Sequence, residues 1–166
     1  NIKGKMLSCS SSSPNVWIIR IGDGKNFYNS IKHSILGLTK QWIGTINKFN
    51  SGDILCFITS KSSGGCIVGM GEFVNSYNRI DEPLVQINTK LNSELGWIGR
   101  NGNEDWDIQI KYKNLVNTSG KSFMKTLIRS PRSVFNRNRL SPEKHTLPEG
   151  NLVEHYKNFL KYGTTY

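Results

Sequence analysis

The chain has 166 residues, of which 36% are hydrophobic and 10% aromatic. This length fits one domain that buries a core without disulfides or metals, and the aromatic content argues against disorder throughout. Lys and Arg number 22 against 12 Asp and Glu, which gives a formal net charge of +10 at pH 7 and favours a polyanionic partner. No apolar run is long enough to span a membrane, and the first residues lack the apolar core of a signal peptide. We therefore expect an intracellular monomer that has no membrane contact, with a flexible tail over 1–14 and one domain over 15–166.

The positive charge is divided unevenly along the chain. Residues 1–60 carry seven basic and two acidic groups, residues 61–110 four and seven, and residues 111–144 nine and one. Two basic blocks that flank an acidic stretch favour a phosphate-binding face. A solvated surface without a polyanionic partner is the alternative interpretation.

The first third of the chain predicts a strand, a turn and a helix. VWIIRI (16–21) is a continuous β-favouring run, typical of a buried strand, and Gly-Asp-Gly at 22–24 predicts a turn. A helix is expected over 26–36, because apolar residues recur there at helical spacing, and Gly37 is expected to end it. The apolar positions of this helix are Phe27, Ile31 and Ile35.

The middle of the chain predicts a hairpin. SGDILCFIT (51–59) indicates a turn and then a strand, KSSGG (61–65) a connection, and CIVGMGEFV (66–74) the returning strand. Gly69 and Gly71 inside the second strand predict a bulge or a close approach of two main chains.

Two further elements follow. DWDIQIKY (105–112) alternates strictly, which predicts a half-buried strand with Gln109 among its outward-facing residues. NLVEHYKNFL (151–160) has the apolar spacing of a helix. Several strands with a few short helices predict an α+β fold built on a small mixed β-barrel or curled sheet.

Motifs for catalysis and metal binding are scarce. The three cysteines form no CxxC pair, so no zinc site or disulfide framework is predicted, and Cys56 and Cys66 are expected to be buried thiols. The sequence contains no HExxH, GxSxG or P-loop motif. Asp105 and Asp107 form a pair that either binds a metal or faces solvent. We expect no cofactor, no metal and no catalytic residue.

The tryptophans fall into two groups. Trp17 and Trp106 lie in predicted strands and are expected in the core, whereas Trp42 and Trp97 lie in polar, glycine-containing segments. A tryptophan in such a segment either covers the core or stacks on a nucleic-acid base, which contributes about 1–3 kcal/mol per base.

Three segments together resemble the YTH and EVE-type domains of the PUA-like superfamily. IRIGDGKNFYNSIK (19–32) followed by Ile35-Leu36 resembles the opening strand and helix of YTH domains. SGDILCFIT and CIVGMGEFV resemble the paired strands that these domains share, and GWIGRNGNEDWDIQIKY (96–112) resembles the segment that follows. The resemblance covers roughly residues 15–135.

The resemblance implies a PUA-like fold with a pocket for one flipped-out base, modified as 6-methyladenine in the case of YTH domains. It implies that Trp97 is a wall of an aromatic cage and that Asn26 binds the base edge, whereas Leu36 stands where YTH domains have the other cage tryptophan. Trp42 is a candidate for that second wall. The predicted base pocket comprises Trp97, Asn26, Leu36, Trp42, Lys25 and Ser30.

Basic residues are expected to hold the nucleic-acid backbone, which positions a strand without reading its sequence. Arg20 has this role by resemblance, and the late basic segment supplies Lys121, Lys125, Arg129, Arg132, Arg137 and Arg139. The expected partner is nucleic acid, with single-stranded RNA favoured, either plain or modified, and DNA as the alternative. Two alternatives remain: an enzyme that acts on RNA or nucleotides through Asp23, Glu72 or His33, and a generic RNA-binding accessory module.

Overall fold

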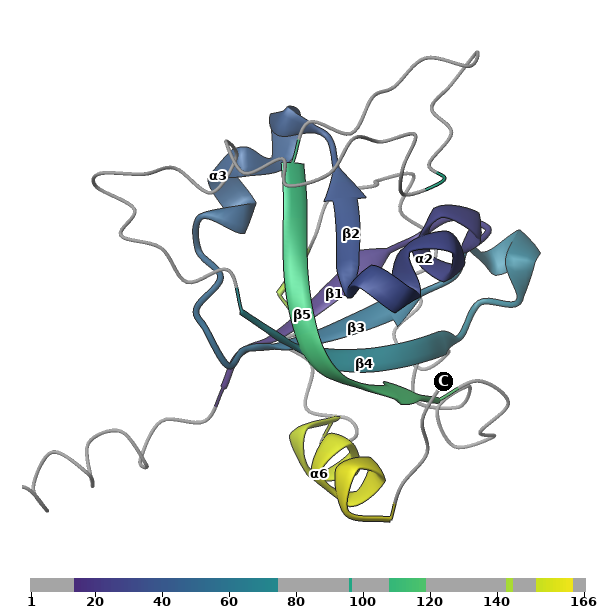
Figure 1. Cartoon of the computed structure of the whole chain (residues 1–166), viewed down its shortest axis with the longest axis vertical. Coiled ribbons are helices and arrows are strands. Elements are labelled where there is room, and N and C mark those ends of the chain that lie inside the picture. The colour runs from purple at the N-terminus through teal and green to yellow at the C-terminus, as the bar shows by residue number, and fades with distance from the viewer. Residues whose placement is uncertain (1–13, 75–95, 97–107, 119–142, 145–151, 163–166) are drawn as a thin grey trace, which may run out of the picture.

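The computed structural model describes residues 14–74, 96, 108–118, 143–144 and 152–162. Figure 1 shows a strongly curved sheet with short helices around it. In chain order the elements are β1 (Val16–Arg20), α2 (Lys25–Ser30), η1 (Ile31–His33), β2 (Ile35–Leu38), η2 (Lys40–Trp42), α3 (Ile43–Ile46), β3 (Ile54–Ile58), η3 (Lys61–Ser63), β4 (Ile67–Phe73), β5 (Ile108–Asn117), β6 (Glu143–Lys144) and α6 (Leu152–Tyr162). No helix within these ranges is long and apolar enough to cross a membrane.

The six strands lie in the order β2-β5-β4-β3-β1-β6. β1 and β3 are parallel, with Val16 opposite Ile54, and the other neighbouring strands are antiparallel. The chain that connects β1 to β3 contains α2, β2 and α3, so the central parallel pair is formed by segments far apart in the sequence. The α+β class and the curled sheet with short helices are confirmed.

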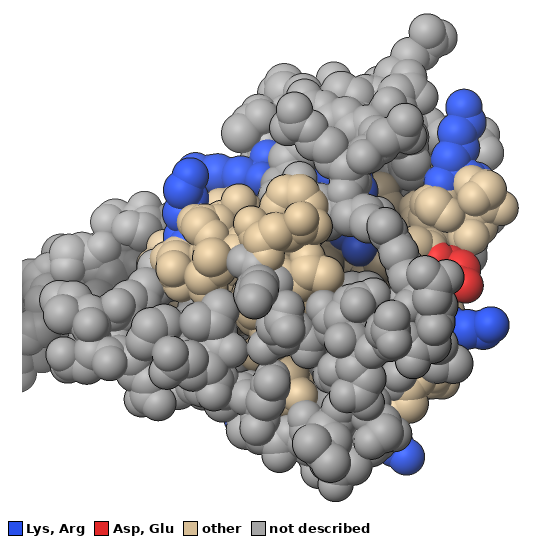
Figure 2. All heavy atoms as spheres, turned by 90° about the horizontal axis from the view of Figure 1, so that it is seen from above, with Lys and Arg blue, Asp and Glu red and all other residues tan. Residues whose placement is uncertain are grey.

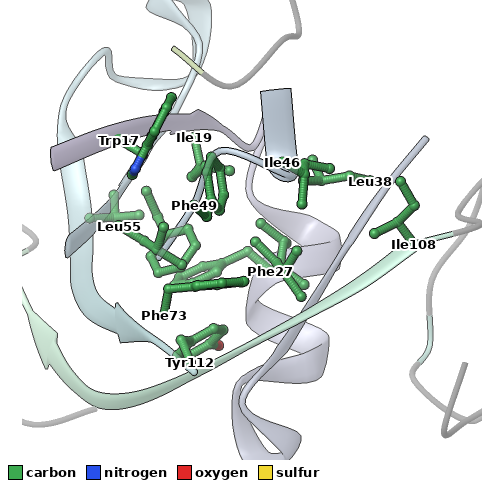
Figure 3. Packing of buried hydrophobic residues seen from close by; sticks show 14 of the residues in the cluster. Trp17, Ile19, Phe27, Leu38, Ile46, Phe49, Leu55, Phe73, Ile108 and Tyr112 are labelled. Carbon is green, nitrogen blue, oxygen red and sulfur yellow. The ribbon is translucent and has the colours of Figure 1, made fainter. Parts of the chain in front are cut away.

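The central strands are buried on both faces, which explains why their sequences are apolar without interruption. Trp17 and Ile19 of β1 point into an inner cluster enclosed by the curved sheet, whereas Val16 and Ile18 point into an outer cluster. Figure 3 shows the inner cluster, where the rings of Trp17 and Phe49 lie 4.5 Å apart between their centroids. The predicted burial of Trp17 is confirmed.

The outer cluster is covered by α6, which lies across the outside of the sheet in Figure 1. Leu152 and Tyr156 of this helix are buried against it, and Val153 and Phe159 pack at its margin. The predicted C-terminal helix is therefore confirmed, with bounds shifted by one or two residues from the predicted 151–160. Cys56 lies in the same cluster, and both it and Cys66 are buried free thiols, as predicted.

The helix predicted over 26–36 is wrong in its second half. α2 ends at Ser30, the 3-10 turn η1 follows, and Ser34 takes a left-handed conformation with φ of 55°. Ile35 then begins β2 and pairs with Lys111 of β5. Gly37 is not a helix stop but lies inside this strand, because the pairing with β5 outweighs the local helical spacing.

Strand β4 confirms the irregularity that its glycines predicted. The pairing of β4 with β5 shifts register between Met70 and Glu72, which places Gly71 at the bulge. A Cβ atom on Gly71 would lie 3.3 Å from the Lys113 carbonyl oxygen and 3.4 Å from the Tyr112 ring. The absence of a side chain therefore permits the two main chains to approach closely.

Strand β5 is longer than expected, and its alternation is incomplete. Its inner residues Ile108, Ile110 and Tyr112 are buried as predicted, but Gln109, predicted to face outward, is only 1% exposed. Gln109 lies opposite Gly37 in the pairing of β5 with β2 and interacts with other groups of the protein, so its side chain is not the outward-facing one that the alternation predicted. Residues 105–107, with Trp106 and both aspartates of the candidate metal pair, lie outside the described residues.

Candidate nucleic-acid interface

The loop from β1 to α2 is fixed by hydrogen bonds at both of its ends. The Ile21 amide donates to the Ile58 carbonyl oxygen at 2.9 Å, and the Gly24 amide donates to the Ile21 carbonyl oxygen at 2.9 Å. Asp23 Oδ1 accepts the Lys25 amide at 2.9 Å. The loop that leads to Lys25 and Asn26 therefore has one defined shape, set by the end of β3 and by the start of α2.

Gly24 is the residue that immediately precedes α2, and it has a left-handed conformation with φ of 87°. A Cβ atom at this position would lie 2.7 Å from Cε2 of Tyr28, so the phenol ring of Tyr28 packs directly over the glycine. Tyr28 is 44% exposed, and its ring also contacts the buried Phe27 edge-on, at 5.4 Å between centroids. This places an exposed aromatic ring on the helix that carries Asn26, a feature that the sequence analysis did not single out.

One contact connects α2 to a segment much later in the chain. Asn29 Nδ2 donates a hydrogen bond of 2.9 Å to the carbonyl oxygen of Gly96, across 67 residues of sequence. Gly96 has φ of 71°, and a Cβ atom on it would lie 3.4 Å from Asn29 Cβ. Gly96 immediately precedes Trp97 in the sequence, and Asn29 lies one helical turn after Asn26 on the same side of α2. No signal in the sequence indicated this role of Asn29, because no local spacing connects α2 with Gly96.

Two predicted pocket residues lie on the exposed side of α2. Lys25 is the first residue of the helix and is exposed, and Asn26 is half-buried and already makes contacts with its surroundings. Both residues follow directly after the loop at 22–24. Their role in binding a base stays a prediction.

Two other predicted pocket residues lie in buried positions. Ser30 is 0% exposed, and its hydroxyl lies 2.6 Å from the Ile35 carbonyl oxygen and 2.9 Å from that of Asn26. It stabilises the turn from α2 into β2. Leu36 is 4% exposed and packs in the inner cluster, because β2 turns this side chain toward the core. Both residues are buried here, and their place in a base pocket stays a prediction.

Of the two candidate stacking tryptophans, the described residues include one. Trp42 is the last residue of η2 and packs, partly buried, against the inner cluster beside Ile43. A side chain in this position covers the core. Covering the core was the alternative to stacking on a nucleic-acid base. Trp97 lies outside the described residues.

The predicted phosphate contacts are mostly outside the described residues. Arg20 is described: it ends β1, is half-buried and already interacts with other groups of the protein. The remaining predicted positions, all between 121 and 139, lie beyond what the structure describes: Lys121, Lys125, Arg129, Arg132, Arg137 and Arg139.

The described surface is nevertheless positive. Figure 2 views the molecule from the top of Figure 1 and shows basic side chains at several places, with acidic atoms at one place only among the coloured residues. Among the residues whose side-chain exposure is described, the exposed acidic ones are Asp23 and Glu154, whereas the exposed basic ones are Lys25, Lys32, Lys48, Lys61, Lys113, Lys144, Lys157 and Lys161. Such a surface attracts polyanions.

Two of the three residues proposed for an enzymatic alternative, Asp23 and Glu72, have structural partners. Asp23 caps the Lys25 amide. Glu72 Oε2 accepts a hydrogen bond of 2.8 Å from Asn114 Nδ2 and lies 3.2 Å from the Tyr156 hydroxyl, so it fastens α6 to the bulge between β4 and β5. Across the described part of the chain, no group of three or more His, Cys, Asp or Glu residues is placed to hold a metal ion.

Comparison with solved structures decides the fold. The Pho92 YTH domain in complex with m6A has a TM-score of 0.51 at 17% identity, over 89% of this chain and 84% of that one. The Mmi1 YTH domain in complex with RNA has a TM-score of 0.52 at 13% identity, over 92% and 83%. The chain has the fold of a YTH domain.

A third YTH structure agrees. The YTH domain of the Zygosaccharomyces rouxii MRB1 protein, in complex with N6-methyladenosine RNA, has a TM-score of 0.50 at 13% identity, over 93% of this chain and 92% of that one. No protein-family model and no curated protein sequence matches the chain. The YTH fold is thus present with a sequence far from those of its structural neighbours.

Proposed function

We propose that this chain is a binding module for single-stranded RNA that holds one flipped-out, modified base between α2 and the segment that follows Gly96. The observation that carries the proposal is the hydrogen bond from Asn29 to the Gly96 carbonyl oxygen. It holds Gly96, which precedes Trp97 in the sequence, against the helix that carries Asn26, and the family resemblance pairs Trp97 with Asn26. The YTH domains of Pho92 and of the MRB1 protein were solved with m6A and with N6-methyladenosine RNA, which supports the same ligand class here.

The chemistry of this site is recognition. Stacking of a base on Trp97 would contribute about 1–3 kcal/mol, which offsets the few kcal/mol needed to take a base out of its stack. The Asn26 amide would bind the edge of the base, and Lys25 would bind backbone phosphate. A methyl group on the exocyclic nitrogen would add about 0.8 kcal/mol if fully buried. Binding is favoured over catalysis because the Asp23 and Glu72 carboxylates are hydrogen-bonded to neighbouring protein groups.

The test is a binding panel of single-stranded RNA and DNA, each with plain adenine or with N6-methyladenine at one position, at one fixed salt concentration. We expect the methylated RNA to bind most tightly. Trp97→Ala should weaken that complex about 5- to 150-fold, the loss of one stacking contact, and should remove the preference for the methylated base. Tyr162→Ala is the matched control, since Tyr162 is an aromatic residue of α6 that is 74% exposed.

Two outcomes contradict the proposal. If the wild-type chain binds plain and methylated RNA equally, it is a generic RNA-binding module, the alternative that the sequence left open. If Trp97→Ala discriminates as well as the wild type, the stacking assignment is wrong, whatever the chain binds.

A further inference from the structure

The connection between β3 and β4 lies directly beside the candidate base site. The Ser60 amide donates a hydrogen bond of 2.8 Å to the carbonyl oxygen of Gly22, in the loop that leads into α2. The Ile21 amide is bound to the end of β3 through Ile58, at 2.9 Å. In Figure 1 the connection is the teal turn at the right, next to the start of α2. Two main-chain hydrogen bonds therefore hold the two loops as one surface.

The connection also has a fixed internal shape. The Ser63 and Gly65 amides both donate to the Ser60 carbonyl oxygen at 2.9 Å, which forms the 3-10 turn η3. At its base the Thr59 amide donates to the Cys66 carbonyl oxygen at 3.1 Å, and both of these residues are buried. The turn is thus built on the rigid end of the β3–β4 pair.

This turn presents to solvent the Lys61 ammonium group and the hydroxyl groups of three serines, Ser60, Ser62 and Ser63. Ser60, Lys61 and Ser62 are exposed, and the Ser60 and Ser62 hydroxyl oxygens lie 3.2 Å apart. The Lys61 ammonium is a positive charge on a flexible stem, and serine hydroxyls donate readily to phosphate oxygens. A phosphodiester matches this set, since it offers one negative charge and several acceptor oxygens.

We propose that the η3 turn binds a backbone phosphate of the strand whose base occupies the α2 site, with Lys61 as the charged contact and the Ser60 and Ser62 hydroxyls as donors. The inference rests on the proposed function, because it takes the strand to pass the loop at 22–24. It adds a contact from the hairpin of the sheet, a region separate in sequence from the basic segment that the charge distribution singled out. Phosphate contacts of this kind position a strand and carry no base preference.

The test measures the salt dependence of binding of the full chain to a short single-stranded RNA that contains one N6-methyladenine. Loss of one phosphate contact from a single strand makes the slope of log K against log salt shallower by about 0.7. We expect this change for Lys61→Gln and a weaker complex at low salt for the double variant Ser60→Ala/Ser62→Ala. The affinity for N6-methyladenosine nucleoside, which has no phosphate, should be the same for the wild type and both variants.

Lys157→Gln is the matched control, because Lys157 is an exposed lysine of α6, the helix on the outer face of the sheet. If Lys61→Gln leaves the slope at the wild-type value, or if Lys157→Gln changes it equally, the phosphate site at η3 is wrong and the base site is unaffected. If instead Trp97→Ala keeps the preference for the methylated base while Lys61→Gln alone lowers the slope, the base assignment fails and the η3 contact stands. Thermal unfolding of each variant checks that the exposed substitutions leave the fold intact.

Discussion

The indole Nε1 of Trp17 donates a hydrogen bond of 2.9 Å to Oδ2 of Asp53, 36 residues later in the chain. The same oxygen accepts the Asn50 amide at 2.9 Å, and Oδ1 accepts the Asn15 amide at 3.1 Å. Asp53 is only 4% exposed. A single buried carboxylate therefore joins the start of β1 to the turn before β3, at the end where Val16 lies opposite Ile54, and helps to set the register of the parallel pair.

Replacement of this carboxylate should destabilise the whole domain. Asp53→Ala leaves the Trp17 indole and two main-chain amides without their acceptor, and each buried donor without a partner costs about 1–3 kcal/mol. We expect the free energy of unfolding to fall by about 3 kcal/mol, and by less for Asp53→Asn, which keeps one acceptor oxygen. Urea unfolding measures both values.

Asp23→Ala is the control for this prediction. Asp23 is exposed, and its carboxylate accepts one amide at the start of α2, so its loss should cost less than about 1 kcal/mol. Equal losses for Asp53→Ala and Asp23→Ala would show that the buried network contributes little to stability.

The same pair of residues shows what the sequence allowed us to predict about the fold. Trp17 lies in a continuous apolar strand, and local pattern was sufficient to place it in the core. Asp53 was recognised only as part of a turn, because its partners at positions 15 and 17 lie far away in sequence and no local period points to them. The other apolar strands, the hairpin, the bulge at Gly71 and the C-terminal helix were predictable in the same way, because their signals lie in the local sequence pattern. The strand β2 was not, because its residues pair with residues of β5 that lie 70 to 76 positions later, as from Leu38 to Ile108 and from Ile35 to Lys111.

The candidate site divides in a similar way. Asn26 was assigned to the pocket by the resemblance of residues 19–32 to YTH domains, together with its neighbour Lys25. The structure places both residues at the start of α2. Ser30 and Leu36 were assigned to the pocket from the segment that resembles YTH domains, Leu36 because it stands where those domains have the other cage tryptophan. Because the chain leaves the helix after Ser30, the hydroxyl of Ser30 turns to main-chain carbonyls and Leu36 enters the core. The contact between Asn29 and Gly96 joins two segments whose proximity no periodicity indicates.

The attachment of α6 to the sheet should weaken at high pH. Burial raises the pKa of Tyr156 far above its ordinary value of about 10, and the nearby Glu72 carboxylate raises it further through its charge and its hydrogen bond. Above pH 10 the unfolded chain therefore releases a proton that the folded chain retains. The contribution of Tyr156 to stability is complete below about pH 10 and is lost as the pH rises beyond it.

Tyr156→Phe tests this directly. At neutral pH the variant should lose about 1 kcal/mol, because the hydroxyl lies 2.7 Å from the Asn114 carbonyl oxygen. Between about pH 10 and 11 the wild type should lose stability more steeply than the variant, by up to about 1.4 kcal/mol per pH unit. Guanidinium unfolding at several pH values measures the difference. Tyr162→Phe changes a residue that is 74% exposed and should match the wild type, and parallel curves for Tyr156→Phe and wild type would contradict the assignment.

The hydrogen bond between Asn29 and Gly96 makes a prediction about RNA binding that separates positioning from stability. Asn29 is exposed, so Asn29→Ala should change the free energy of unfolding by less than about 0.5 kcal/mol. It should weaken binding of methylated RNA about fivefold, the equivalent of one hydrogen bond of about 1 kcal/mol, because the segment that enters Trp97 loses its anchor on α2. Asn158→Ala, at an exposed asparagine of α6, should leave the affinity unchanged.

A double-mutant cycle identifies the route of this effect. If Asn29 acts by positioning Trp97, then Asn29→Ala should have no further effect on affinity in a chain that already carries Trp97→Ala, since the side chain to be positioned is gone. Fluorescence anisotropy with labelled methylated RNA gives the four affinities. Additive losses would show that Asn29 contacts the RNA independently of Trp97. In that case the anchor at Gly96 would not be what brings the stacking residue and the Asn26 edge to the same base.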